Sequence, residues 1–483
     1  MKKLILKALE SKIQGNILHA KEFREFYSVD ASSYKILPKI IVIPKNENDV
    51  INTIKIAKKM KTSVTVRGAG TGLVGSALNS GIILDMKNFD AIRLGKNYVN
   101  VGTGTVKGKL DKKLETSKKF FAPNPSIGSF CSVGGMLGNN SSGSRSLKYG
   151  SVIDNVLEIT YVDGNGNKIT LPKNEKKSKE IIKIANSIDY KKFPNVTKNS
   201  SGYRLDKIKT INDTHKIIIG SEGTLGIILS AKLKIQNNPK KRILFVIEYD
   251  SILKAAINCT EINKTNPSAV EFVDKTTFEQ IKCKFDKKSK CLLFVEYDSN
   301  IKSCETSLKR IVAGKIVKKL QTKFEISKWW RYRDSSLHYS LKSIKKENRI
   351  PHVIEDAAVP VENLPKLFLI LTKINKKYNT KSIVYGHAGN GNVHIRLISN
   401  RRKIDTVKNI AIEYFHEILN LGGTITAEHG DGLARSEFIK KQYGEKNYKI
   451  FKKIKNYFDP SNILNPGKII TTKSTIIKNL EKF

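Results

Sequence analysis

The stretch VTVRGAGTGLVGSALNSGIILD, residues 64–85, decides the fold. Two β-branched runs flank a turn whose glycines at 70, 72 and 75 formally match the pattern GxGxxG. In a nucleotide-binding βαβ unit, a helix connects such a turn to the next parallel strand. Here only residues 76–80 follow before the next strand-like run, and their Asn and Ser would break a helix. We therefore expect a strand that ends in a glycine-rich turn able to surround an anion, or a tight turn without a ligand.

Two further segments share this glycine-rich character. Residues 122–156, APNPSIGSFCSVGGMLGNNSSGSRSLKYGSVIDNV, contain six glycines, and IGSEGTLGII follows at 219–228. Residues this small make a poor core, but they let the backbone approach a large flat ligand closely.

Length and composition exclude several classes of protein. A chain of 483 residues with 39% hydrophobic residues can form two or three globular domains. No apolar run approaches the roughly 20 residues of a membrane-spanning helix. The start, MKKLILKALESK, predicts an amphipathic helix rather than a signal peptide, because Lys7 and Glu10 interrupt its apolar run. Five cysteines without a CxxC pair predict reduced thiols in a cytoplasmic protein and exclude an Fe–S or zinc-finger set.

The net charge of +43 arises from 87 basic and 44 acidic residues. Lysine supplies 73 of the basic residues and is spread over the whole length, whereas nucleic-acid sites favour arginine and clustered patches. We therefore expect a solvated lysine-rich surface and no nucleic acid. An acidic partner or peripheral contact with an anionic membrane remains open.

The second half has a different pattern. ILFVIEYD at 243–250 and CLLFVEYD at 291–298 are strand-like, and helical patterning separates them. This arrangement predicts an α+β domain with an antiparallel sheet. From Tyr443 the sequence predicts a helix that ends at FDPSNILNPGK, residues 458–468.

Two of the eight histidines lie in IVYGHAGNGNVHIRL, residues 383–397. The pattern predicts strand, loop, strand, and the glycines of the loop allow His387 and His394 to converge, as two imidazole ligands of a metal must. TITAEHGDG, residues 424–432, ends a further predicted strand and could supply an oxygen donor. Because no HExxH pattern is present, ordinary loop histidines remain the alternative.

These segments together resemble a known family. RGAGTGLVG, the 123–150 segment, GSEGTLGI and FDPSNILNPGK resemble the FAD-binding domain of the vanillyl-alcohol oxidase/p-cresol methylhydroxylase superfamily. GHAGNGNVH at 386–394 and TAEHGDGLARSEF at 426–438 resemble its branch of D-lactate, glycolate and D-2-hydroxyglutarate dehydrogenases. The resemblance covers nearly the whole chain.

The resemblance implies an α+β fold. It implies a two-subdomain FAD-binding domain of the p-cresol methylhydroxylase type at residues 1–238 and an α+β cap domain with an antiparallel sheet at 239–440. Residues 441–483 would return to the FAD domain. The implied FAD-binding residues are Arg67, Gly68, Ala69, Gly70, Thr71, Gly72, Leu73, Pro123, Ser132, Gly134, Gly135, Asn139, Ser142, Gly143, Gly220, Glu222, Gly223, Gly226, Ile227 and Asn465.

The resemblance also bears on how FAD is held. Thr71 occupies the turn in which a histidine often anchors FAD covalently in this superfamily, and Cys131 is offset by one residue from another attachment region. We therefore expect non-covalent FAD.

The implied active site contains a metal. His387, His394 and Glu428 would hold Zn²⁺ or a similar divalent ion, and His429 would accept the hydroxyl proton of the substrate while the α-hydrogen leaves as hydride to the flavin. Arg333 would bind the substrate carboxylate and Asn392 would orient the substrate. A surface arginine and a turn asparagine are the alternatives for these last two residues.

Departures from the family pattern narrow the expected substrate. Asn390 replaces the acid of the usual GHxGDGN loop, and Leu337 and Ile354 lie near positions where D-2-hydroxyglutarate enzymes carry threonine and lysine. D-lactate or glycolate is therefore favoured, and D-2-hydroxyglutarate remains possible. Since the chain lacks Fe–S cysteines, we expect a separate electron acceptor, which would be an Fe–S protein, an electron-transfer flavoprotein or a quinone. The alternative functions are a same-fold flavin oxidase, an alkyl-glycerone-phosphate synthase and a basic non-enzymatic binding protein.

Overall fold

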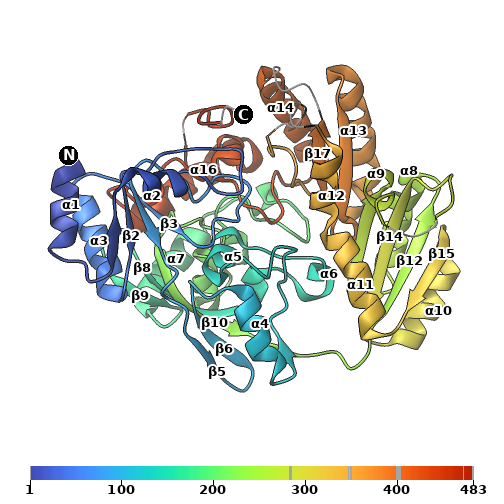
Figure 1. The fold of residues 1–483 in the computed structure, drawn as a ribbon, viewed down its shortest axis with the longest axis horizontal. Coiled ribbons are helices and arrows are strands. Elements are labelled where there is room, and N and C mark those ends of the chain that lie inside the picture. The colour runs from blue at the N-terminus through green and yellow to red at the C-terminus, as the bar shows by residue number, and fades with distance from the viewer. Residues whose placement is uncertain are drawn as a thin grey trace.

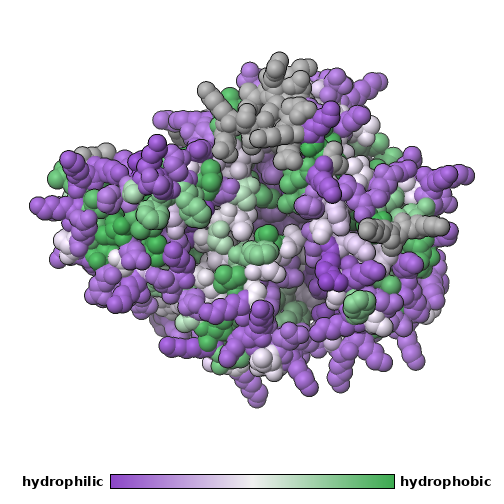
Figure 2. Space-filling model, in the orientation of Figure 1, coloured by the Kyte–Doolittle hydropathy of each residue, from purple (hydrophilic) through white to green (hydrophobic). Residues whose placement is uncertain are grey.

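A computed structural model describes residues 2–281, 285–345, 348, 351–398, 404–471 and 473–480. The sheets of the first half of the chain lie at the left and centre, and the six-stranded sheet of the second half lies at the right (Figure 1). Hydrophilic side chains cover most of the face in Figure 2, as the lysine-rich composition predicts. Among the helices of the described ranges, none is both long and apolar enough to cross a bilayer.

The first sheet contains the stretch that decides the fold. β3 (Val64–Arg67) and β4 (Ile82–Asp85) are parallel neighbours, and residues 68–81 connect them without a helix. No helix lies between the two strands, as expected. The loop alone connects them, although they run parallel. β2 (Ile40–Ile43) and β1 (Asn16–Leu18) complete the sheet, and its apolar face packs against α1 (Lys2–Glu10) and α3 (Glu47–Lys59).

A second, antiparallel sheet forms the rest of the first half. Its order is β5-β6-β10-β8-β9. Short helices lie between β6 and β8, partly within the glycine-rich segment, and β7 and β11 form a separate two-stranded sheet. The elements are β5 (Ile92–Leu94), β6 (Tyr98–Gly102), α4 (Lys107–Glu115), β7 (Lys119–Phe120), α5 (Val133–Asn139), α6 (Ser146–Tyr149), β8 (Val156–Val162), β9 (Lys168–Leu171), α7 (Glu175–Ala185), β10 (Ile227–Lys234) and β11 (Gln236–Asn237).

The second half contains a six-stranded antiparallel sheet of order β15-β12-β14-β13-β16-β17. The two similar apolar segments form β12 (Ile243–Tyr249) and β14 (Cys291–Tyr297), which confirms the predicted strands and the antiparallel sheet. The two strands pair with each other along their whole length. The other strands are β13 (Ala269–Asp274), β15 (Lys315–Leu320), β16 (Lys381–His387) and β17 (Asn392–Ile398).

Helices cover both faces of this sheet, and β12, β13 and β14 at its centre are buried on both sides, whereas the edge strand β15 is largely exposed. One face packs against α8, α10, α13 and α14, and the other packs against α9 and α11, whose two tryptophans are buried there. The bounds are α8 (Ile252–Asn263), α9 (Lys275–Phe278), α10 (Ile301–Ile311), α11 (Lys323–Asp334), α12 (Ser336–Ser343), α13 (Leu364–Tyr378) and α14 (Ile404–Asn420).

The segment after α14 corrects one prediction. Residues 424–428, expected to end a strand, form only an isolated bridge between Thr424 and Ala358. The carboxylate of Asp356 instead accepts the backbone N–H groups of residues 427, 428 and 429 at 3.1, 2.9 and 2.8 Å. A buried side chain far away in sequence therefore supplies the partners that a neighbouring strand would have given.

The last part of the chain packs against the first half. α15 (Gly432–Arg435) is followed by α16 (Ile439–Phe458), which is interrupted at Gly444, where φ is 74°. Beyond α16, Leu464 bridges to Val64 of β3, and Asn465 accepts a hydrogen bond from Thr65 at 3.0 Å. The predicted C-terminal helix is confirmed, although it begins before Tyr443. The domain limits given above stay a prediction.

Candidate active site

A cavity of about 520 Å³ lies where the glycine-rich segments of the first half meet the β16–β17 hairpin. This volume is within the roughly 300–1,000 Å³ of ordinary ligand sites. The predicted cofactor residues that line it are Arg67, Gly68, Ala69, Gly70, Thr71, Gly72, Leu73, Ser132, Gly134, Gly135, Asn139, Ser142, Gly143, Glu222, Gly223 and Gly226. Of the other predicted site residues, Arg333, His387, His394, Glu428 and His429 also line it.

Three cavity glycines show that the wall suits a large ligand. A Cβ atom on Gly72 would lie 3.6 Å from its nearest neighbour, Ser76 Oγ, and one on Gly138 would lie 4.0 Å from its nearest neighbour, Glu222 Cα. On Gly135 it would meet only Ser132 Oγ, at 3.3 Å. Their missing side chains therefore leave space to the cavity rather than to the protein, as a cradle for a cofactor of FAD size requires.

Arg67, the last residue of β3, supports the turn that follows this strand. Its Nη1 donates to the carbonyl of Val29 at 2.8 Å, and its guanidinium lies where a Cβ on Gly70 would be, 2.4 Å from Nη2. Gly70 also has φ of +71°, so a side chain at this position is excluded twice.

Four predicted cofactor residues lie outside the cavity wall. They are Pro123, Gly220, Ile227 and Asn465. Asn465 has a clear structural role, since its Nδ2 donates to the carbonyls of Ser76 at 2.8 Å and Glu222 at 2.7 Å. It thereby fixes two cradle loops against each other.

The predicted metal ligands converge on one oxygen. Oε1 of Glu428 lies 2.9 Å from Nε2 of His387 and 3.3 Å from Nε2 of His394. The hairpin explains this, because His387 ends β16 and His394 faces the same side from β17, with Tyr385 opposite it in register. All three side chains are buried. Two imidazole nitrogens and a carboxylate oxygen form a donor set that suits a divalent cation.

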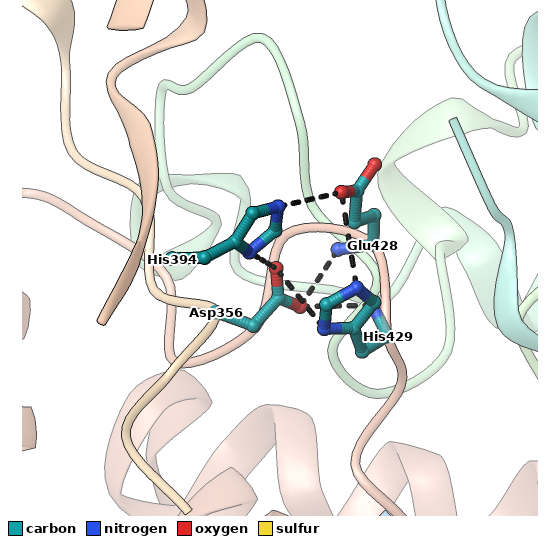
Figure 3. A group of neighbouring side chains, drawn as sticks. All are labelled: Asp356, His394, Glu428 and His429. Atoms are coloured by element: carbon teal, nitrogen blue, oxygen red, sulfur yellow. Dashed lines mark hydrogen bonds and ion pairs between the residues drawn. The ribbon is translucent and has the colours of Figure 1, made fainter. Parts of the chain in front are cut away.

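The four side chains whose donor atoms lie closest together are not identical to the three predicted metal ligands. Asp356, His394, Glu428 and His429 each offer a ligand atom, and these atoms lie within 4.8 Å of one another (Figure 3). Asp356 already accepts three backbone N–H groups through Oδ2, so its main effect is to shape the turn that carries Glu428. His394 and Glu428 belong to both donor sets.

Electrostatics divide the histidines into two kinds. Burial lowers the pKa of His394 to about 4, so its imidazole is neutral and has a free lone pair, as a metal ligand needs. Burial also opposes the charge on His429, but the carboxylates of Asp356 and Glu355 outweigh it and raise its pKa to about 9. His429 therefore holds its proton at neutral pH in this structure.

Lys198 is a component of the site that the sequence did not reveal. Its side chain is completely buried, and Nζ donates to Oε2 of Glu428 at 3.1 Å and to Oδ1 of Asn392 at 3.4 Å. Ser142 Oγ also donates to Oε2. Burial works against ionisation of Glu428, but Lys198 and His387 outweigh it and keep the pKa of this carboxyl well below its usual range. One oxygen of Glu428 is thus held while the other faces the histidines.

Arg333 and Asn392 have protein partners that their predicted roles did not include. Arg333 donates to Oε2 of Glu271 through Nε at 2.6 Å, and Asp334 lies 3.7 Å from Nη1, so two carboxylates already neutralise its guanidinium. Asn392 lies behind the cavity wall and donates to the carbonyl of Ala357 at 3.1 Å. Their roles in binding and orienting the substrate stay predictions.

The glycine-rich wall and the cluster of His387, His394, Glu428 and His429 line the same cavity. This combination defines an enzyme of the FAD-dependent class. Two family models match the chain: the FAD binding domain at residues 38–187 and the C-terminal domain of FAD linked oxidases at residues 238–469. The protein therefore combines an FAD binding domain with the C-terminal domain of FAD linked oxidases and is an FAD-dependent oxidoreductase.

Curated relatives match over most of the chain. The glycolate oxidase subunit GlcD of Bacillus subtilis is 28% identical, with 92% of each chain covered. The mitochondrial D-lactate dehydrogenase [cytochrome] of Arabidopsis thaliana is 26% identical over 97% of this chain and 80% of its own. The D-2-hydroxyglutarate dehydrogenase of Pseudomonas putida is 27% identical over 95% of this chain, which spans only 51% of that protein.

A solved structure shares the fold. An alkyldihydroxyacetonephosphate synthase superposes with a TM-score of 0.70 at 18% identity, covering 96% of this chain and 86% of its own. At this identity the likeness concerns the fold alone.

We expect all FAD to leave the protein on denaturation. Thr71 cannot form the histidyl link, and burial raises the pKa of Cys131, which lines the cavity, to about 11, so that its reactive thiolate is scarce. Acid precipitation of the yellow protein, followed by absorbance of the supernatant, measures the released fraction. Colour that stays with the precipitate would contradict the expectation.

Proposed function

We propose that this protein oxidises a D-2-hydroxy acid to the 2-oxo acid and that D-lactate or glycolate is favoured over D-2-hydroxyglutarate. The observation that supports the proposal is one cavity lined by both the glycine cradle and a cluster of histidines, carboxylates and arginines. The names of the relatives from Bacillus, Arabidopsis and Pseudomonas agree with this class of substrate.

The reaction removes two hydrogens from the carbinol group. The hydroxyl proton goes to a base, and the α-hydrogen leaves with its electron pair. When bound, FAD supplies the two-electron acceptor, and a divalent ion, for which we favour Zn²⁺, supplies a Lewis acid that acidifies the hydroxyl. His387, His394 and Glu428 would hold the ion, as their meeting at Oε1 supports.

His429 is the candidate base. Its Nδ1 is fixed by Oε1 of Glu355 at 2.7 Å, so Nε2 is the nitrogen left to face Glu428, at 3.9 Å from Oε1. A base must begin without the proton, whereas the carboxylates raise the pKa of His429 to about 9. A cation bound at Glu428 would lower the pKa of His429 and leave its Nε2 without a proton. The base and the ion would therefore act in the same site.

Anaerobic bleaching of the flavin tests the proposal. We expect the yellow absorbance of the FAD-loaded protein to fade with D-lactate or glycolate, to persist with L-lactate, and to fade far more slowly after chelation of the metal. A synthase-like or non-enzymatic protein would stay yellow with every acid, and that result would reject the proposal. Rapid reoxidation by air would indicate an oxidase.

Three further features belong to this proposal. We expect a separate electron acceptor, which could be an Fe–S protein, an electron-transfer flavoprotein or a quinone, and a cytoplasmic location. The high positive charge would favour an acidic protein as acceptor. Electron transfer from the reduced flavin that slows steeply with salt would support such a partner.

A further inference from the structure

Arg396 is a second arginine in the cavity wall, and no part of the reaction described above uses it. It lies on β17 two positions beyond His394, so both side chains point to the same face of the sheet, about 7 Å apart along the strand. Its side chain is 4% exposed. A buried guanidinium without a function would be costly, which makes its contacts informative.

Two of the three nitrogens of Arg396 are held by neighbours. Nε donates to the hydroxyl oxygen of Tyr385 at 3.3 Å, and Nη2 lies 3.6 Å from Oε2 of Glu355. Nη1 is buried and has no hydrogen-bond partner in the described part of the chain. One donor nitrogen of the guanidinium therefore stays unsatisfied, at a residue that borders the cavity.

Glu355 connects this arginine to the candidate base. Its Oε2 lies beside Arg396, and its Oε1 accepts from Nδ1 of His429 at 2.7 Å. A ligand group bound at Arg396 would thus have its neighbouring carbon close to His429. Arg333, by contrast, already donates to Glu271 and has Asp334 beside it. Of the two arginines, Arg396 has the more available charge.

We propose that Arg396, together with the hydroxyl of Tyr385, binds the carboxylate of the substrate. The proposal rests on the proposed function for the identity of the substrate, but the anion site can be tested without turnover. A carboxylate can accept from both Nη1 and the tyrosine hydroxyl, and such charge-assisted bonds are the strong ones. The site would recognise monocarboxylates and dicarboxylates alike, because it contacts the group that every 2-hydroxy acid has.

Binding of carboxylates that cannot react tests the site. Propionate and malonate are titrated into the FAD-loaded protein, and their dissociation constants are measured by calorimetry and by the shift of the flavin spectrum. We expect Arg396→Gln to weaken both ligands about tenfold or more, as the loss of a charge-assisted contact implies. Arg396→Lys should recover part of the affinity, since it keeps the charge but places no nitrogen at the position of Nη1. Arg331→Gln, an exposed change on α11, is the control and should have no effect.

Several results would overturn the proposal. Unchanged affinity in Arg396→Gln would mean that water alone satisfies Nη1, and a loss confined to malonate would place the obligatory carboxylate elsewhere. A tenfold loss in Arg333→Gln without one in Arg396→Gln would assign the role to Arg333. If Arg396→Gln cannot retain FAD, Arg396→Lys decides, because unchanged affinity despite the loss of Nη1 also overturns the proposal. If no hydroxy acid bleaches the flavin but Arg396→Gln still loses propionate, the proposed reaction fails and the anion site stands.

Discussion

Replacing Glu428 by Gln should abolish binding of the proposed divalent cation and lower the rate of flavin reduction by about a thousandfold. The amide keeps the size of the side chain but loses the charged oxygen on which His387 and His394 converge. A Lewis acid contributes several kcal/mol to such a reaction, and each ~1.4 kcal/mol corresponds to a factor of ten. Metal content by elemental analysis and anaerobic stopped-flow absorbance measure the two effects separately.

The ion pair with Lys198 requires a matched control. Glu428→Gln leaves the buried ammonium of Lys198 without its partner, which by itself costs about 3–5 kcal/mol of stability. Lys198→Met breaks the same pair but keeps the carboxylate, so this variant should lose stability and still bind the cation. Equal loss of metal in both variants would show that the broken pair, rather than the missing ligand, is responsible. Full metal content in Glu428→Gln would contradict the assignment directly.

Replacing Gly135 by Leu should give a folded protein that retains less FAD. A side chain here would project into the cavity, since Ser132 Oγ is the only protein atom that a Cβ would meet, at 3.3 Å. Forcing extra atoms against a fitted ligand costs about 1–3 kcal/mol, so FAD affinity should fall roughly 10- to 100-fold. Flavin content after gel filtration and titration of the apo-protein with FAD measure the loss.

Gly135→Ala serves as the graded control. Gly135 lies in α5, where alanine is favoured over glycine by up to about 1 kcal/mol, so the apo-protein should melt at the same or a higher temperature. Its FAD affinity should lie between those of the unmodified protein and Gly135→Leu. Equal affinity for all three proteins would show that FAD does not contact this part of the wall.

Local pattern predicted much of the fold correctly. β-branched runs predicted β3 and β4, and the two similar apolar segments predicted the strands β12 and β14 of an antiparallel sheet, although not that these two strands are neighbours. The glycines around residue 389 predicted the hairpin that brings His387 and His394 together. Pattern failed at residues 424–428, because the carboxylate of Asp356 satisfies that backbone in place of a strand.

The sequence by itself determined the two strands that flank the glycine-rich turn, the apolar strands β12 and β14, and the hairpin of the two histidines, because each depends on the spacing of residues near one another in the chain. Only the tertiary structure decided which charges meet. Lys198 and Glu428 are 230 positions apart, and Glu355 joins Arg396 to His429 across three segments of the chain. Such pairs have no periodicity that a sequence can display, since their energy depends on distance and burial, which arise only when the chain is folded.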